Sequence, residues 1–168
     1  MEVWHWDTFY DDLARIAAAS LLGGAIGLER EWNGHWAGLR THTMVAIGAA
    51  IFVIGGTTAH GQNIDGPSRV IQGVASGIGF LGAGTILKLG DKMEIKGLTT
   101  ASSIWLAAAL GIAAGLAEYA LAVASAAISL FVLCVLGPIE KAMETRHRQK
   151  NSEKKKLEGT EEGGPKTP

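Results

Sequence analysis

The fold is decided by residues 73–84, which read GVASGIGFLGAG and place five glycines inside an uncharged segment, Val70 to Leu87. In water, each glycine in a helix costs roughly 1 kcal/mol relative to alanine. In a lipid bilayer, small residues instead let helix backbones approach one another closely. The segment is also long enough to cross the hydrocarbon core as a helix, which takes about 17 to 25 residues. We therefore predict a membrane protein.

Four further apolar segments repeat this signal. They meet or approach transmembrane length and cover Phe9 to Leu28, Thr43 to Ala59, Leu98 to Leu116 and Tyr119 to Leu136. The predicted fold class is therefore all-α, a polytopic bundle of five transmembrane helices. The first segment carries Asp11, Asp12 and Arg15 in its opening turns, which we expect at headgroup level. Because the connection between the last two segments is very short, a four-span bundle that buries one tight hairpin is the alternative.

The placement of charges predicts the orientation. With the N-terminus outside, the inner segments hold thirteen Lys and Arg residues and the outer segments hold only Arg69. This bias fits the positive-inside rule, and it would be lost with four or six spans. We thus divide the chain into a transmembrane domain, residues 1–140, and a polar cytoplasmic tail, residues 141–168, whose composition predicts disorder. Attachment of the tail lysines to anionic membrane lipid is the alternative for that segment.

Motifs for enzymatic chemistry are weak. Residues 77–82 fit the dinucleotide pattern G-x-G-x-x-G, but they lie in the middle of an apolar span and follow no predicted strand. The five histidines are scattered over both sides of the membrane and show no paired metal-ligand spacing. Cys134 stands alone in an apolar run, which predicts a buried thiol. We predict neither an enzyme nor a nucleic-acid-binding protein, and we predict no cofactor.

Two charged stretches predict a functional site at the inner mouth. GLERE at 27–31 ends the first span and GLRTH at 38–42 opens the second. The helix dipole disfavours Glu29 at a C-terminal end and Arg40 at an N-terminal end, so we predict that these two side chains pair. Solvated loop charge is the alternative. The predicted mouth consists of Glu29, Arg30, Arg40, Thr41, His42, Thr99 and Thr100, with Ser102 and Ser103 one turn further in.

Small residues four apart predict close helix contacts within the bundle or between protomers. Such pairs are Gly23 with Gly27, Gly73 with Gly77, and Gly111 with Gly115. The third segment differs, because its glycines occupy more than one helix face, as in helices that break or line a polar path. Its predicted packing or pathway residues are Gly73, Ser76, Gly77, Gly79, Gly82 and Gly84.

Four ordered motifs resemble the MgtC/SapB family of bacterial inner-membrane proteins. They are GLERE at 27–31, AGLRTH at 37–42, SGIGFLGAG at 76–84 and GLTTAS at 97–102, and the resemblance covers about residues 12–118. It implies a short form of the family, without the soluble C-terminal domain of longer members, associated with magnesium limitation, acid tolerance or intracellular survival. Some members are understood to restrain the proton-translocating ATP synthase, and the resemblance implies that enzyme as a partner.

Two functions stay open at this stage. A regulator that acts through helix contacts with a membrane partner, or with a second copy of the chain, explains the small-residue faces and is slightly preferred. A magnesium or proton pathway is the alternative. Mg²⁺ prefers oxygen ligands and keeps several waters, and no predicted span places a carboxylate near mid-bilayer. We therefore expect no dehydrated magnesium site, while passage of the hydrated ion stays open and its ligands stay unassigned.

Overall fold

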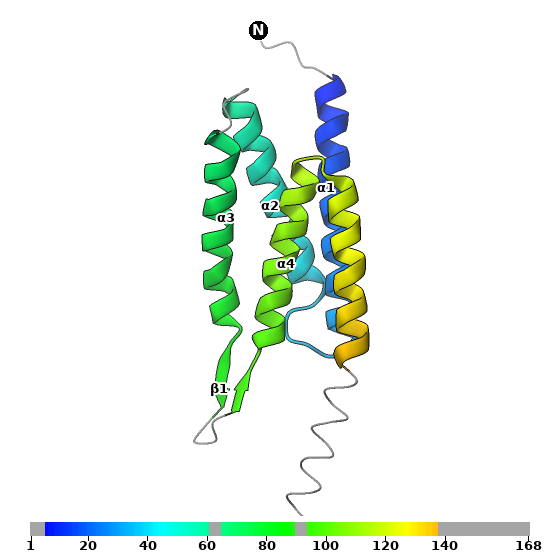
Figure 1. The fold of residues 1–168 in the computed structure, drawn as a ribbon, viewed down its shortest axis with the longest axis vertical. Coiled ribbons are helices and arrows are strands. Elements are labelled where there is room, and N and C mark those ends of the chain that lie inside the picture. The colour runs from blue at the N-terminus through cyan, green and yellow to red at the C-terminus, as the bar shows by residue number, and fades with distance from the viewer. Residues whose placement is uncertain (1–5, 61–64, 90–93, 138–168) are drawn as a thin grey trace, which may run out of the picture. The chain divides into compact units, whose positions relative to one another are not determined.

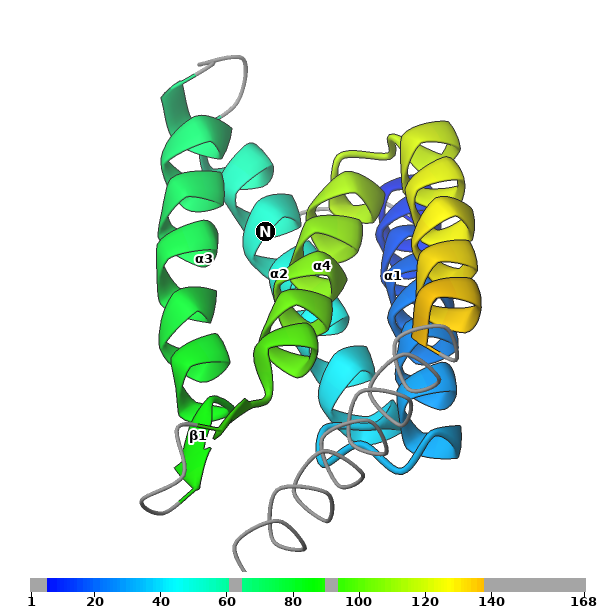
Figure 2. The same ribbon diagram turned by 60° about the horizontal axis from the view of Figure 1, so that its bottom comes forward.

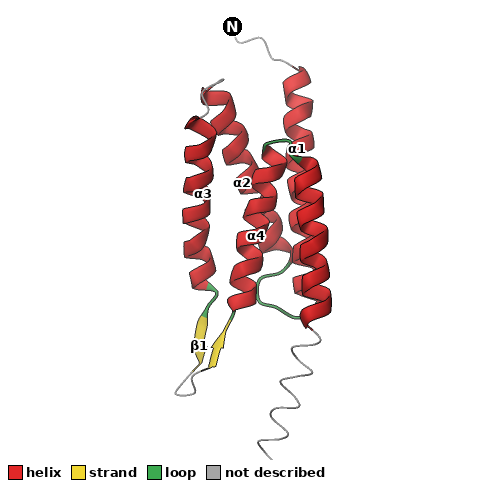
Figure 3. Ribbon diagram, viewed as in Figure 1, coloured by secondary structure: helices red, strands yellow, loops and turns green. Residues whose placement is uncertain are grey.

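The computed structural model describes residues 6–60, 65–89 and 94–137, and these are mainly helical (Figures 1 and 3). The elements, in chain order, are α1 (Trp6–Trp32), α2 (Leu39–His60), α3 (Asp65–Gly84), β1 (Leu87–Leu89), β2 (Glu94–Lys96), α4 (Leu98–Gly115) and a last helix, Tyr119–Gly137. The helices up to Leu130 belong to one compact unit, and a second unit begins at Phe131, of which the structure describes only the end of the last helix. The predicted tail, residues 141–168, lies outside the described residues.

The third helix and the segment after it differ from the prediction. The helix begins at Asp65 and ends at Gly84, so the expected span from Val70 to Leu87 runs too far toward the C-terminus. An antiparallel hairpin follows, in which Leu87 pairs with Lys96 and Leu89 with Glu94. The strands read LKL and EIK, and such alternation of apolar and charged residues is typical of a strand. The fold is therefore helical with one small hairpin, rather than purely helical.

Gly97 connects the hairpin to α4 and lies beside Thr85, just after the end of α3. It lies between β2 and α4 with a φ of 99°, in the left-handed region that favours glycine. A Cβ at this position would also meet the carbonyl oxygen of Thr85 and would lie 2.9 Å from its carbonyl carbon. Only glycine therefore allows β2 to turn into α4 beside α3.

The second helix lies against both α1 and α4, and glycines make these contacts close (Figures 1 and 2). A Cβ added at Gly23 of α1 would lie 2.5 Å from the Ala46 Cβ, and one added at Gly27 would lie 2.7 Å from the Leu39 Cα. On the other side of α2, a Cβ at Gly111 of α4 would strike the Ala46 carbonyl oxygen. These contacts confirm the close packing predicted from the glycine pairs of the first and fourth spans.

The glycines of α3 do not pack in this way. Apart from the backbone of α3 itself and the adjacent residues, no atom of the described residues lies within 4 Å of a Cβ built at Gly73, Gly77, Gly79 or Gly84. Gly82 alone among the predicted α3 glycines has a neighbour, the Ala101 Cβ, at an ordinary 3.7 Å, and Ser76 is exposed. The predicted packing of Gly73 and Gly77 is therefore not formed within the described chain, because the face that carries them points away from α2 and α4.

Three of the described helices are long and apolar enough to cross a membrane. They are Leu39–Thr58, Leu98–Gly115 and Tyr119–Gly137, with mean hydropathies of 1.4, 1.5 and 2.5. The protein is a membrane protein on this ground. Cys134, which the sequence predicts to be buried, is exposed on the last helix.

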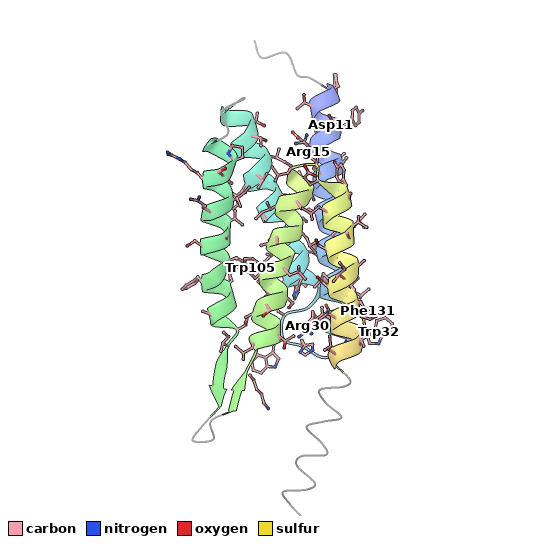
Figure 4. All side chains as sticks on the ribbon, in the orientation of Figure 1. Asp11, Arg15, Arg30, Trp32, Trp105 and Phe131 are labelled. Atoms are coloured by element: carbon pink, nitrogen blue, oxygen red, sulfur yellow. The ribbon has the colours of Figure 1, made fainter. Side chains whose placement is uncertain are left out.

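Arg15 stabilises the bundle at the end opposite the α1–α2 loop (Figure 4). Gly115 is the last residue of α4, and its carbonyl oxygen accepts a hydrogen bond from the Arg15 Nη1 at 3.3 Å. A cation at a helix C-terminus satisfies a free carbonyl and complements the helix dipole. The arginine in the opening turns of the first apolar segment thus has a specific partner a hundred residues away along the chain.

Candidate functional site

The loop between α1 and α2 positions the predicted mouth. This loop, residues 33–38, lies at the same end of the helices as the β1–β2 hairpin and the start of α4 (Figure 1). It leaves α1 through Asn33, whose backbone N–H donates to the Glu29 carbonyl at 3.1 Å, and Gly34, whose φ is 73°. At its other end, the Glu31 carboxylate accepts a hydrogen bond from the backbone N–H of Leu39 at 2.8 Å. A carboxylate on a free N–H at a helix start is favoured by the helix dipole.

Glu29 pairs with Arg30, not with Arg40. The Arg30 Nη1 lies 3.8 Å from the Glu29 Oε2, and the side chains are only 3% and 9% exposed. Asn33 holds the other carboxylate oxygen, because its Nδ2 donates to the Glu29 Oε1 at 2.7 Å. The predicted Glu29–Arg40 pair is wrong, since the ion pair of Glu29 among the described residues is with Arg30, and Arg40 is exposed. The sequence reasoning also missed Asn33, although its spacing of four residues from Glu29 is a usable helical signal.

His42 is the centre of a second buried cluster. Its side chain is fully buried, with Nδ1 2.8 Å from the Gly38 carbonyl oxygen and Nε2 2.9 Å from the Ser103 Oγ. The Ser103 hydroxyl in turn donates a hydrogen bond to the Thr100 carbonyl oxygen at 2.9 Å. This cluster joins the start of α2 to the start of α4.

The protons of the His42 cluster can be counted. A hydroxyl has one proton, and a neutral imidazole has one N–H. The three contacts of the cluster are Nδ1 with Gly38, Nε2 with Ser103, and Ser103 with Thr100. With a neutral ring, the cluster has two protons and makes two of these hydrogen bonds. With an imidazolium ring it makes all three, because Ser103 accepts from Nε2 and donates to Thr100. The charged side chains that act on the ring electrostatically are Arg30 and Glu29. The two buried clusters thus lie close enough for their charges to interact.

The predicted mouth residues divide into a buried and an exposed set. Buried or nearly so are Glu29, Arg30, His42 and Thr100, whereas Arg40, Thr41 and Thr99 are exposed. Beside the loop lies an open hollow of about 660 Å³. It is lined by Glu31, His35, Trp36, Gly38, Arg40, Thr41, Met44 and Val45. Among the described residues, no three His, Cys, Asp or Glu side chains lie together as metal ligands would.

The fold and the site define a helical membrane protein that carries a buried ion pair and a buried histidine at one end of its helices. The MgtC family model matches residues 16–142. The chain belongs to the MgtC family.

Individual relatives agree with this assignment. The chain is 42% identical over 122 residues to Protein MgtC of Salmonella typhimurium (strain 14028s / SGSC 2262), a match that covers 73% of this chain and 49% of the relative. It is 40% identical over 139 residues to Protein MgtC of Brucella abortus (strain 2308), covering 83% and 57%. The chain thus spans about half the length of these curated relatives. No solved structure matches it.

Proposed function

We propose that the chain is a multi-pass protein of the bacterial inner membrane with five spans, its N-terminus outside and its C-terminus inside. The charge bias of the sequence supports this orientation. Trp32 and Trp36 support it as well, because they are 84% and 89% exposed at the end proposed to be cytoplasmic. Exposed tryptophans collect at membrane–water interfaces, where the ring meets the headgroups. Membrane lipid is then the first partner of the protein.

Single cysteines test this topology in a Cys134→Ser background. We expect Trp36→Cys to react with a membrane-impermeant maleimide only from the cytoplasmic side, and Glu118→Cys only from the periplasmic side. Both side chains are exposed and lie in opposite connections of the chain. The parent Cys134→Ser protein controls for background labelling. Labelling of both sites from one side would contradict the odd number of spans between them.

We propose further that the protein acts in adaptation to magnesium limitation or acid stress as a regulator of another membrane protein. One observation carries this proposal, namely the glycine-containing face that α3 leaves uncovered in the described chain, which also carries the 84% exposed Phe80. Gly73, Gly77 and Gly84 are exposed there, together with Gln72 and Ser76. Small residues give a helix little to gain from lipid, but they let a second helix approach closely and hydrogen-bond.

The partner is a transmembrane helix of another protein, and the ATP synthase is the partner that the family resemblance implies. A second copy of the chain would fit the same face, which makes a homo-oligomer the alternative occupant. No metal or cofactor is needed for either form of contact. In this proposal the protein is not an enzyme.

Gly77→Leu separates association from folding. We expect this variant to unfold in detergent at the temperature of the wild type, because no described atom lies within 4 Å of the new Cβ. We expect growth in low magnesium and copurification of the membrane partner to be lost, since the leucine holds two helices apart. Gly55→Leu on α2 is the matched control, because Gly55 is also exposed and without a neighbour within 4 Å. Normal growth of Gly77→Leu would overturn the proposed face.

An ion pathway for Mg²⁺ or H⁺ is the second candidate, and the buried polar groups of His42, Ser103 and Thr100 favour it. Purified protein in liposomes distinguishes the two functions. A pathway through the cluster predicts Mg²⁺ or H⁺ flux that falls in His42→Leu but not in Gly77→Leu. Empty liposomes give the background. The regulator proposal predicts no flux above this background in any of the proteins, and flux in the wild type would overturn it.

A further inference from the structure

Arg30 presents a buried edge without a partner. Its side chain is 3% exposed, and within residues 6–60, 65–89 and 94–137 its one ion pair is the long contact of Nη1 with Glu29, at 3.8 Å. Its Nε and Nη2 are both buried and have no hydrogen-bond partner in the part of the chain that the structure describes. A buried charged donor without a hydrogen-bond acceptor destabilises the fold, so such donors normally have an acceptor. We therefore expect a ligand to accept hydrogen bonds from Nε and Nη2 of Arg30.

The two free nitrogens define the shape of that ligand. The N–H of Nε and one N–H of Nη2 lie along the same edge of the planar guanidinium and point in parallel. This edge matches two oxygens of one carboxylate or phosphate group, which it binds through two charge-assisted hydrogen bonds. On the other side of the guanidinium, the Glu29 Oε2 lies 3.8 Å from Nη1, which is an ion-pair distance and not a hydrogen bond. One oxyanion is the ligand that this arrangement fits.

The surroundings favour phosphate. Two helices, α2 and α4, begin at this end of the molecule, where helix N-termini carry partial positive charge, and at α2 the Glu31 carboxylate already accepts from the Leu39 N–H. Trp32, two residues after Arg30, is 84% exposed, as is typical of residues at the depth of the lipid headgroups (Figure 4). Phosphate is the anion that the bilayer supplies at this depth, either in phospholipid headgroups or from the adjacent water.

We propose that the Nε–Nη2 edge of Arg30 binds one phosphate group, carried by an anionic phospholipid or by inorganic phosphate. Because both nitrogens are closed to solvent, the side chains around them move when the phosphate enters. The site takes a single phosphate, because one guanidinium edge offers only two parallel donors. This inference does not depend on whether the protein regulates a partner or conducts an ion.

Arginine Nε–H resonances test the site directly. The full chain, labelled with ¹⁵N-arginine, is placed in phosphatidylcholine nanodiscs and titrated with inorganic phosphate, with chloride at equal ionic strength as the control. A second sample replaces part of the lipid with phosphatidylglycerol. We expect one slowly exchanging Nε–H resonance, that of the buried Arg30, to shift on phosphate binding. Arg30→Lys keeps the charge but loses the parallel donors, and should bind about tenfold more weakly. Arg40→Lys, an exposed change, should bind as the wild type does.

The outcomes separate the sources and can refute the site. A shift with phosphate identifies the free anion as a ligand, and a shift with phosphatidylglycerol alone identifies the lipid headgroup. Wild-type resonances that respond to neither would show that water alone satisfies Arg30, and would overturn the proposal even if Arg30→Lys fails to fold. Equal binding by Arg30→Lys and the wild type would overturn it as well.

Discussion

Gly111→Ala is expected to destabilise the folded protein by about 3 kcal/mol, the upper end of the usual cost of overpacking. A Cβ at this position meets the Ala46 carbonyl oxygen and lies 2.8 Å from its carbonyl carbon and 2.9 Å from its Cα. These are backbone atoms of α2, which cannot rotate aside as the end of a flexible side chain can. The methyl group therefore has room only if α4 and α2 move apart along their whole contact.

The measurement is the free energy of unfolding in detergent micelles. Gly77→Ala is the matched control, because it makes the same change on a helix where no described atom lies within 4 Å. It should be neutral or slightly stabilising, since alanine is the better helix former. Equal stability of the two variants would show that the close contact of α2 and α4 does not exist in the micelle.

Ser103→Ala is expected to destabilise the protein by about 2 kcal/mol, because it leaves the buried Nε2 of His42 without a partner. In a His42→Leu background the same change should cost much less, since no ring nitrogen is then stranded. The difference between the two costs measures the coupling of the pair, for which contacting residues typically give about 0.5 to 3 kcal/mol. Unfolding in detergent provides all four values of this double-mutant cycle.

Ser102→Ala is the control for this cycle. Its hydroxyl donates only to the Leu98 carbonyl one turn back in α4, at 2.9 Å, and the residue is exposed. This change should therefore be close to neutral in both backgrounds. If Ser103→Ala costs the same in the presence and absence of His42, the hydrogen bond at 2.9 Å contributes nothing to stability.

Hydropathy and spacing predicted the helices and part of their packing. A run of apolar residues must be buried in protein or face lipid, and small residues at every fourth position form a flat stripe along one face of a helix. These rules suffice for Gly111 and Gly115. They fail for Gly73 and Gly77, which have the same spacing, because spacing does not show whether a neighbouring helix lies on that side. The contact depends on the arrangement of the helices, which sequence spacing does not encode.

The charge argument had a similar limit. The helix dipole correctly indicated that Glu29 needs a cation, but it does not show on which side of the helix each residue emerges. Successive residues of a helix are rotated by about 100°, so neighbouring positions face different surroundings: Arg30 of α1 is buried, whereas Arg40 at the start of α2 is exposed. The hairpin was missed because its two strands have only three residues each and follow a long apolar segment.

The line of His42, Ala46 and Ala50 on α2 has a mechanical consequence. Glycines of α1 and α4 contact this line from two sides, at Gly23 and Gly27 and at Gly111 and Gly115. A roll or slide of α2 by one residue would bring a larger side chain against a glycine that has no space to receive it. These close contacts with backbone atoms therefore oppose sliding of α1, α2 and α4 against one another, whereas among the predicted packing glycines of α3 only Gly82 has a neighbour, at an ordinary 3.7 Å from the Ala101 Cβ.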